Sequence, residues 1–259
     1  MAKLSAVIIT KNEEKNIRRC LESVIEVADE IIVIDSQSTD NTIGICREFR
    51  VEIFQLEWKG YAHAKNYGIG KTKNDYILSI DADEVLSESL IHSIQKVKEQ
   101  LTGAYEFNRL SNYCGQWIHH CGWYPDRKIR IFPRNKAQWS GDFVHERLEF
   151  SESVKMTNLH GDLFHYSFAS LSDHIQRVDK YSQLAAEELI QKGKGLFFFR
   201  MIALPVFKFL KSYFLQKGFL DGFLGFCICT ISGFDVFIRY AKAIQIERMK
   251  VSSQNRESK

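Results

Sequence analysis

Short apolar runs alternate with helical patterns along residues 1–101. Apolar runs of strand length predict strands, and apolar residues at helical spacing predict the helices between them. We expect strands at Leu4–Thr10, Glu30–Ile34, Val51–Leu56 and Tyr76–Ile80, and helices at Glu13–Val27, Thr42–Phe49, Tyr61–Gly70 and Ser87–Leu101. Such alternation needs crossover connections, which give a mostly parallel sheet covered on both faces, with ligands at the carboxyl ends of the strands.

After Thr102 this alternation stops. We expect further strands at Ala104–Tyr113, Arg127–Phe132 and Leu159–His165, followed by a helix at Ser172–Lys192 with Ser172 as its N-cap. The segment Gly193–Gly195 is the best candidate for a domain boundary. The sequence therefore predicts a first domain over residues 1–192 and a helical extension over 193–259.

The average composition is that of a soluble enzyme, with 45% hydrophobic and 26% charged residues. It excludes a disordered chain and a polytopic membrane protein. The net charge of +3 is too small to indicate a nucleic acid as partner. The apolar run at the N-terminus is too short for a signal peptide, so we expect a cytoplasmic protein with reduced cysteines. A zinc site at Cys114, His119, His120 and Cys121 is an alternative, but the spacing matches no common structural site.

The C-terminal quarter departs from this average. Eleven of the nineteen phenylalanines lie between Phe197 and Phe237, and no acidic residue lies between Leu189 and Leu220. No uninterrupted apolar run reaches the length of about 18 residues that a membrane span needs. A basic, aromatic segment of this kind suits the surface of a membrane. Packing on the first domain or on a second subunit is the alternative.

Three acidic residues follow the strand at Tyr76–Ile80. Asp81, Asp83 and Glu84 repel one another unless a cation or solvent compensates their charge. Asp81 and Asp83 are two positions apart, so in extended backbone both carboxylates face the same side. That arrangement suits a divalent ion completed by water and phosphate oxygens. The alternative is an acidic turn before the helix that begins at Ser87.

Polar residues also follow the other strands. Asp35 ends the second strand, and the hydroxyls and carboxylate of Ser36–Asp40 can bind a base or ribose or cap the next helix. Thr10, with Asn12 and Glu13, occupies the same place after the first strand. Lys65 offers a cation for a diphosphate, although a lysine on a helix is more often a solvated charge.

These residues form four motifs, Thr10–Glu13, Val33–Asp40, Ala62–Gly68 and Asp81–Glu84, in a familiar order and spacing. In them the chain resembles the family 2 glycosyltransferases, which have the GT-A fold. Later runs, at Gly122–Asp126, Arg130–Phe132, 144–146 and Gly218–Gly222, resemble the branch that builds lipopolysaccharide inner core, in particular the glucosyltransferase that extends core heptose.

The resemblance implies an α/β protein with the GT-A nucleotide-diphospho-sugar transferase fold, a mostly parallel central sheet flanked by helices. The C-terminal helical extension would associate with the membrane. Residues 1–101 would form the nucleotide-sugar half and residues 102–192 the acceptor half. Asp35 would contact the nucleobase, and Thr10, Asn12 and Glu13 would border the nucleoside.

The same resemblance assigns the diphosphate and metal contacts. Asp83 would bind a Mg or Mn ion that bridges the diphosphate, with Asp81 beside the ribose or a metal-bound water. Lys65 stands where the family often has Arg and would contact phosphate. His165 matches the downstream histidine of the family and would be a further metal ligand, with His160 as the alternative. A histidine in an apolar strand is also often a packed residue.

Sugar transfer with inversion needs a base that takes the proton of the acceptor hydroxyl. Many relatives place an acidic pair after the acceptor segment, whereas this chain has Val144-His145-Glu146-Arg147. Glu146 is therefore the candidate base and His145 the second choice. The alternative is a surface carboxylate paired with Arg147.

Aromatic and basic residues gather in the expected acceptor half. The aromatic faces suit sugar rings but also suit core packing, and the cations suit a phosphorylated acceptor but also suit solvent. The residues are Trp117, Trp123, Tyr124 and Trp139, and Arg127, Lys128, Arg130 and Arg134.

Together these features predict a metal-dependent, inverting hexosyltransferase that uses a UDP-sugar, with glucose as the favoured sugar, and a lipopolysaccharide core acceptor. We expect it on the inner face of the cytoplasmic membrane, and the sequence is compatible with a homo-oligomer. The alternatives are a sugar-phosphate nucleotidyltransferase, which would favour a glycine-rich loop that Thr10–Glu14 lacks, and a non-catalytic membrane-associated scaffold.

Overall fold

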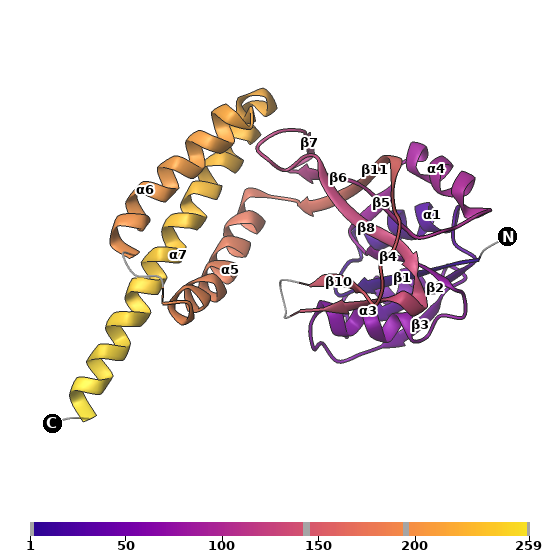
Figure 1. Cartoon of the computed structure of the whole chain (residues 1–259), viewed down its shortest axis with the longest axis horizontal. Helices are drawn as coiled ribbons and strands as arrows, with labels where there is room; N and C mark the ends of the chain where they lie inside the picture. Colours follow the sequence, from indigo (N-terminus) through magenta and orange to yellow (C-terminus); the bar gives the residue numbers. More distant parts are fainter. Residues whose placement is uncertain (1–2, 142–145, 194–196, 258–259) are drawn as a thin grey trace. The chain divides into compact units, whose positions relative to one another are not determined.

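The computed structural model describes residues 3–141, 146–193 and 197–257. The chain forms two compact units, one of Met1–Leu110 with Pro125–Tyr166 and one of Ser111–Tyr124 with Ser167–Lys259 (Figure 1). These units do not follow the expected division at residue 192, because a hairpin tip and a helix from the expected acceptor half pack with the C-terminal helices.

The first unit is built on a parallel sheet. Its four strands are β1 (Leu4–Thr10), β2 (Glu30–Asp35), β3 (Glu52–Gln55) and β4 (Tyr76–Asp81). They pair in parallel in the order β3-β2-β1-β4. Every residue of β1 is buried, as befits a strand with helices on both faces. The predicted parallel arrangement is confirmed.

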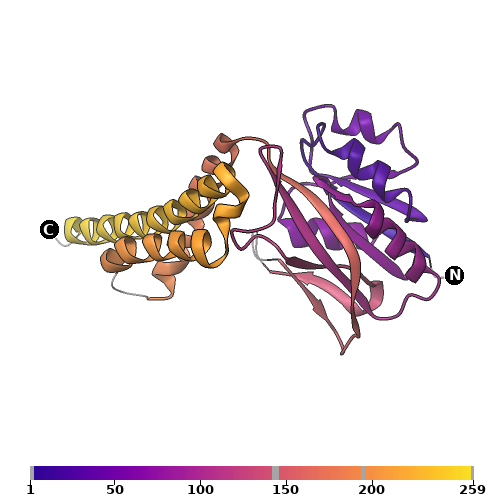
Figure 2. The same ribbon diagram turned by 90° about the horizontal axis from the view of Figure 1, so that it is seen from above.

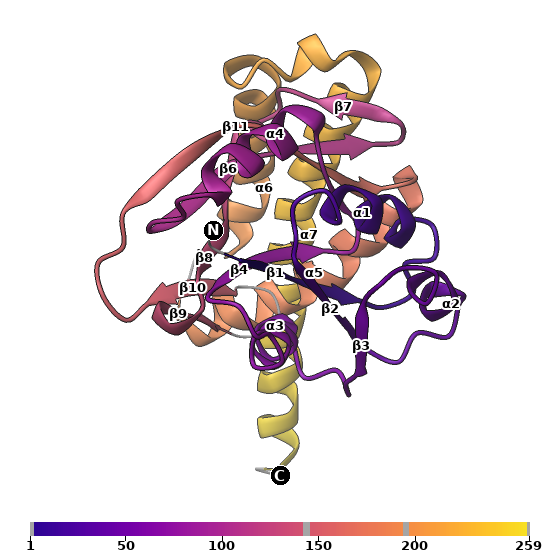
Figure 3. The same ribbon diagram turned by 90° about the vertical axis from the view of Figure 1, so that its right-hand side faces the viewer.

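Helices cover both faces of this sheet (Figure 3). One face packs against α1 (Ile17–Val24), α2 (Thr42–Cys46) and α4 (Glu88–Lys98), and the other against α3 (Tyr61–Ile69). The helix α1 is shorter than predicted because the residues before Ile17 form turns rather than helix. The carboxyl ends of the strands are therefore followed by loops, which the helices do not cover.

The helix α3 lies unusually close to the sheet. A Cβ atom at Gly68 would stand 2.4 Å from Val7 Cγ1 and 2.9 Å from Ile34 Cγ1, so only glycine permits this approach. Gly60, at the start of α3, has a φ of 105°, which other residues rarely adopt. Gly68 thus lets α3 pack closely against β1 and β2, and Gly60 permits the turn that starts the helix.

The sheet continues with further strands, and the first of them runs antiparallel to β4 and to the strand on its other side. After β4 the order is β8 (Asp126–Pro133), β6 (Ala104–Tyr113), β11 (Met156–Phe168) and β5 (Glu84–Leu86). A separate ribbon joins β9 (Ala137–Ser140), which follows the short helix η1 (Arg134–Lys136), to β10 (Arg147–Phe150). The strands β5, β9 and β10 are not predicted by the sequence pattern.

The second unit consists mainly of helices, α5 (Leu171–Gln191), α6 (Phe197–Leu210) and α7 (Gly222–Glu257). A turn of η2 (Lys211–Leu215) and η3 (Gly218–Asp221) joins α6 to α7, and these two helices run side by side (Figure 2). The N-cap of α5 is Ser170 rather than Ser172, because Ser170 and Asp173 form a reciprocal capping box.

A hairpin tip at Ser111–Tyr124, which includes β7 (Gln116–Ile118), belongs to the same unit. The buried carboxylate of Asp221 accepts hydrogen bonds from the backbone N–H groups of His119 and His120, at 3.3 and 2.9 Å. Its Oδ1 also lies 2.9 Å from His120 Nδ1. Asp221 therefore joins the hairpin tip to the turn between α6 and α7.

One helical stretch in the described part of the chain, Gly218–Met249, is long and apolar enough to cross a membrane. This qualifies the sequence prediction, which considered only uninterrupted apolar runs. Length and composition alone do not distinguish a span from a helix that lies on a membrane or within a protein.

Candidate active site

The register of the parallel strands brings the predicted polar residues to one edge. In the pairing of β1 with β2, Thr10 is opposite Asp35, and in the pairing of β1 with β4, Ile9 is opposite Asp81. All three strands end here with their carboxyl ends, where open α/β sheets bind ligands. The sequence prediction that these residues meet at one edge is confirmed.

The loops after β1 and β2 are joined by hydrogen bonds. Asn12, with a φ of 56°, donates its backbone N–H to Ser38 Oγ at 2.9 Å, and its side-chain oxygen accepts from the backbone N–H of Thr39 at 2.8 Å. Asn12 thus holds the two loops together, in addition to the expected place beside a nucleoside. Asp40 accepts from the backbone N–H of Thr42, the first residue of α2, at 3.0 Å, whereas the N-cap position is Asn41, whose side chain makes no capping hydrogen bond.

Asp35 is fully buried, and its carboxylate is already engaged within its own loop. Oδ2 accepts from the backbone N–H of Ser38 at 3.0 Å, and Oδ1 accepts from the hydroxyl of the same serine. In the structure Asp35 therefore shapes the loop after β2, a role that the sequence motif did not reveal. Its contact with a nucleobase stays a prediction.

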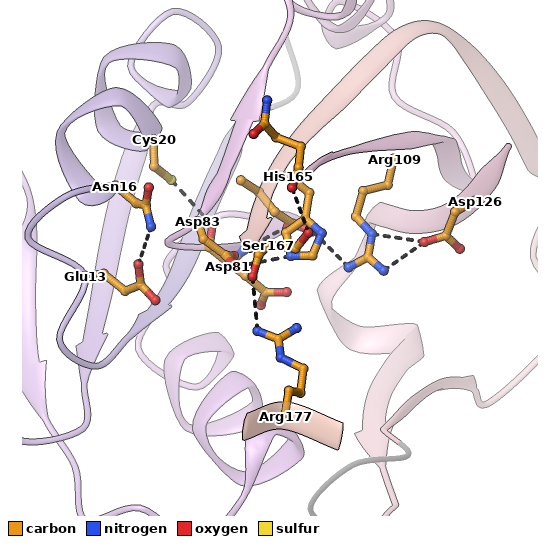
Figure 4. Close-up of polar contacts among 12 residues, drawn as sticks. Glu13, Asn16, Cys20, Asp81, Asp83, Arg109, Asp126, His165, Ser167 and Arg177 are labelled. Carbon is orange, nitrogen blue, oxygen red and sulfur yellow. Dashed lines mark hydrogen bonds and ion pairs between the residues drawn. The ribbon is translucent and has the colours of Figure 1, made fainter. Parts of the chain in front are cut away.

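Thr10 and Glu13 are two further polar side chains at this edge. Thr10 Oγ1 is buried and has no hydrogen-bond partner among the described residues. Glu13 accepts from Asn16 Nδ2 at 2.7 Å (Figure 4), and burial, with the nearby carboxylates of Asp83 and Asp40, raises its pKa above 4.5. The edge thus carries an excess of negative charge that a cation would relieve.

Lys65, on α3, lies at the centre of the site and is only 1% exposed. Its Nζ lies 3.2 Å from Asp81 Oδ1 and 3.0 Å from Glu146 Oε1, and 4.4 Å from the ring centroid of Trp139. Lys65 is therefore not a solvated charge. Its ammonium group contacts both the candidate base Glu146 and Asp81, the first carboxylate of the acidic motif.

Arg130, on β8, is the second buried cation and is 3% exposed. Its Nη2 donates to Asp81 Oδ2 at 3.0 Å and to the fully buried carboxylate of Glu84. Burial alone would raise the pKa of Asp81, but the charges of Lys65 and Arg130 hold it well below its usual value. Arg130 thus keeps Asp81 ionised and does not face an acceptor or solvent, which corrects the sequence interpretation.

Asp83 lies in the turn after β4 and does not share partners with Asp81. Its Oδ2 lies 3.2 Å from His165 Nε2 (Figure 4). This proximity arises because β5 pairs antiparallel with β11, with Glu84 opposite His165, and because Asp83 O accepts from Tyr166 N–H at 2.9 Å. The expected extended geometry of Asp81 and Asp83 is wrong, since residues 82–83 form a turn.

These side chains fit a partial site for a divalent cation. Two neighbouring ligands on an ion with bonds of about 2.1 Å stand about 3 Å apart, close to the separation of Asp83 and His165. Among the described residues, no group of three or more His, Cys, Asp or Glu side chains is arranged to hold a metal. Asp83 and His165 would therefore need oxygen ligands from water and a bound phosphate. His160 is exposed, on the same strand.

Two of the four aromatic residues considered for contacts with an acceptor, Trp139 and Trp123, pack against core clusters of the protein. Trp139 is buried and packs edge-on against Phe132. In the second unit, Trp123 packs with Tyr113 and Phe168. Burial lowers the pKa of His174, which packs beside them, to about 4. The sequence could not separate these packed rings from binding surfaces, because both use the same residue types.

The cysteine and histidine cluster considered for zinc does not assemble. His120 pairs with Asp221, and Cys121 is buried with Cys229 in the core of the second unit. The catalytic candidate His145 lies outside the described residues, whereas Glu146 lies within them.

The fold is that of a GT-A-like α/β protein. A mannosyltransferase from Pyrobaculum calidifontis, solved in complex with GDP-Man and Mn²⁺, superposes with a TM-score of 0.54 and 14% sequence identity. The match covers 94% of this chain and 87% of that one. The family model "Glycosyl transferase family 2" matches residues 5–175, and the chain belongs to that family.

Curated relatives agree with this assignment. An uncharacterized glycosyltransferase of Rickettsia prowazekii is 32% identical over 98% of this chain and 90% of its own length. The lipopolysaccharide core biosynthesis glycosyltransferase LpsC of Rhizobium meliloti is 27% identical, over 95% of this chain and 94% of LpsC. The chain is thus similar to these proteins over almost their whole length.

Proposed function

We propose that this family 2 glycosyltransferase transfers a hexose, with inversion, from a UDP-sugar to a lipopolysaccharide core acceptor, and that the reaction requires Mg²⁺ or Mn²⁺. One observation carries the catalytic part of this proposal. Lys65 Nζ contacts both Asp81 and Glu146, so the candidate base lies at the carboxyl edge where a donor would bind.

The donor side of the proposal rests on the edge of the sheet. The buried Thr10 Oγ1 and the loop held by Asn12 and Ser38 would border the nucleoside. Asp83 and His165 would hold the cation, which when bound supplies Lewis acidity toward the departing diphosphate. The negative excess near Glu13 favours such a cation.

In the proposed reaction the acceptor oxygen attacks the anomeric carbon while the bond from that carbon to the diphosphate oxygen breaks. Glu146 accepts the proton of the acceptor hydroxyl as the nucleoside diphosphate leaves on the opposite face. Lys65 orients Glu146 through their contact of 3.0 Å. Arg130 fixes Asp81 so that this arrangement is present before the substrates bind.

The identity of the substrates has separate support. The family resemblance of the sequence motifs favours UDP-glucose as donor. The similarity to LpsC, whose name states a role in lipopolysaccharide core biosynthesis, favours that class of acceptor. The solved mannosyltransferase contains a nucleotide sugar and Mn²⁺, which agrees with a cation at the Asp83–His165 pair.

A transfer assay tests this function. UDP-glucose, a deep-rough lipopolysaccharide acceptor and Mn²⁺ are incubated with the enzyme, and the linkage of the product is read by NMR. We expect an inverted anomeric centre, and a loss of about 10²–10⁴-fold in kcat for Glu146→Gln. Glu149→Gln, an exposed residue of β10, the strand that begins directly after Glu146, is the matched control and should keep full activity.

Other outcomes would assign a different function. Release of pyrophosphate from a nucleoside triphosphate and a sugar phosphate, without sugar transfer, would favour a nucleotidyltransferase. Donor binding without turnover on any acceptor would favour a non-catalytic scaffold. Full activity of Glu146→Gln would reject the proposed base.

A further inference from the structure

The outer face of α6 is strongly apolar and exposed. Phe198 and Phe199 are 67% and 71% exposed, and the other side chains of this face are also accessible. They are Ile202, Val206, Phe207 and Leu210. Since Phe197 on the opposite side is buried against Tyr240 of α7, the exposed arc is the side of α6 that has no partner within the described second unit.

The apolar face continues through the turn and along α7. Leu215 is 76% and Phe223 is 72% exposed, and Phe226, Phe234 and Phe237 follow Phe223 at helical spacing. Tyr213 stacks edge-on with Phe214, Phe219 and Phe226 and so connects the turn to α7. We call these exposed side chains of α6, the turn and α7 the α6–α7 apolar surface.

Cations border this surface. Arg200 and Lys211 stand at i−7 and i+4 from Phe207, which places them at the edge of the exposed arc of α6. Lys208 and Lys217 lie on the same helix and turn. Within the described residues, these four side chains form no ion pair, although acidic partners neutralise Lys192, Arg239 and Lys242.

An exposed apolar face of this size needs an occupant, because apolar surface gains free energy on leaving water. The positive charges beside the apolar surface indicate which kind of partner fits it. A second copy that docked through the same face would set cations against cations. Anionic lipid head groups, in contrast, complement the basic border while the phenylalanines enter the interface.

The packing of α7 argues against a transmembrane position. Lys242 Nζ, on α7, donates to Asp179 Oδ1 at 2.8 Å and to Ser182 Oγ at 3.0 Å, both on α5. The helix α5 exposes charged residues, and α7 packs along it. A spanning α7 would have to abandon this polar partner or carry it into the hydrocarbon.

We propose that the α6–α7 apolar surface binds the surface of a membrane that contains anionic phospholipids, with α6 and α7 lying in the plane of the interface. This inference goes beyond the proposed sugar transfer and does not depend on it, because it rests only on the second unit. Its test measures lipid binding without donor or acceptor.

The test is flotation of the full chain with vesicles of phosphatidylcholine, with and without phosphatidylglycerol. We expect flotation with the phosphatidylglycerol vesicles, at least about tenfold less with phosphatidylcholine alone, and release by high salt. The triple variant Phe198→Ser/Phe199→Ser/Phe207→Ser and the charge variant Arg200→Glu/Lys211→Glu should each lower the bound fraction by about tenfold or more.

A matched control separates lipid binding from a general effect of apolar exposure. Ile175→Ser on α5 removes an apolar side chain that is 52% exposed and lies outside the α6–α7 apolar surface, so flotation should not change. Circular dichroism and thermal unfolding establish that each variant is folded. A loss of flotation in folded phenylalanine and charge variants, but not in the control, supports the proposal.

Three results would overturn it. One is unchanged flotation of both folded variants. Another is binding that ignores lipid charge and resists alkaline extraction, since that would indicate that α7 spans the membrane. The third is a dimer in sedimentation analysis that the phenylalanine variant dissociates while flotation stays the same, because the surface would then bind a second copy.

Discussion

The active-site edge and the α6–α7 apolar surface both contain cationic side chains. The cations of the active-site edge are buried and paired with acids, whereas those beside the apolar surface are not paired with any described acid. Lys65 and Arg130 are buried, and each contacts two carboxylates. Arg200 and Lys211 border the α6–α7 apolar surface, where no described acid pairs with them. Buried cations must be compensated inside the fold, whereas exposed cations leave their charge available to an external partner.

The net charge of +3 conceals this contrast. In the first unit the buried cations Lys65 and Arg130 are paired with acids, whereas Glu13 is partly buried near Asp83 and Asp40, and burial together with these carboxylates raises its pKa. The second unit presents positive charge beside apolar side chains. The two regions therefore predict different responses to the loss of a charge.

The largest effect on stability is expected from Arg130→Met. The variant leaves Glu84 fully buried and without its closest cation, so the free energy of unfolding should fall by about 3–5 kcal/mol. Urea denaturation measures this change. Arg127→Met, which removes an exposed pair with Glu106, should change stability by less than about 1 kcal/mol. Equal effects of the two substitutions would mean that Arg130 is not a structural anchor.

The next effect concerns Lys65 and catalysis. Lys65→Met should lower kcat by about 10–100-fold, because Glu146 loses the group that orients it. The readout is the double variant, because Lys65→Met should lower kcat little further once Glu146 is replaced by Gln. Lys65→Arg retains the cation and should restore much of the rate. A loss in kcat that is as large in the Glu146→Gln background as in the wild type would leave Lys65 only a structural role.

Asp221→Asn tests the connection within the second unit. An amide can replace only part of the set of hydrogen bonds that Asp221 accepts from His119, His120 and the imidazole of His120. We expect the free energy of unfolding of this region to fall by about 1–2 kcal/mol. Faster hydrogen exchange of residues 116–121 would measure this change. Protection that is unchanged in this hairpin tip would contradict the role assigned to Asp221.

The smallest effect concerns Glu13 and has a defined pH dependence. Because the pKa of Glu13 is raised in the folded state, its contribution to stability is fully present below about pH 4.5 and is lost as the pH rises through the folded pKa. Glu13→Gln should therefore raise the free energy of unfolding at pH 7 by less than about 1 kcal/mol, and should change nothing near pH 4.

Glu22→Gln, an exposed residue on α1, is the control for this measurement. Added Mn²⁺ should reduce the advantage of Glu13→Gln, because a bound cation relieves the same repulsion. A stabilisation by Glu13→Gln that appears only at low pH would reverse the sign and refute the account of the negative excess.

Much of the fold could be predicted from local patterns. The strands β1 and β6 match the predicted bounds of Leu4–Thr10 and Ala104–Tyr113, because each is a run of strand-forming residues with a clear end. The short strand β5 was missed, since three residues carry no periodic signal. Its pairing with β11 is long-range, and this pairing places His165 beside Asp83.

The sequence predicted which residues belong to the candidate site, but it did not predict which side chains contact one another there. Motif order and the rule for parallel sheets place Thr10, Asp35 and Asp81 together. That Arg130 neutralises Glu84 depends on a strand about 50 residues later in the chain, which no local pattern reveals. For the same reason the sequence left sugar contact and core packing open for Trp123, since its packing partners Tyr113 and Phe168 are identified only by the fold.

The most direct test of the account is protection from thermal unfolding by UDP-glucose, measured with and without Mn²⁺. We expect a rise in Tm for the wild type that requires Mn²⁺, and no rise for Asp83→Asn. Asp75→Asn, an exposed residue before β4, should behave as the wild type does. Equal protection of wild type and Asp83→Asn, with or without Mn²⁺, would contradict a cation-dependent donor site at this edge of the sheet.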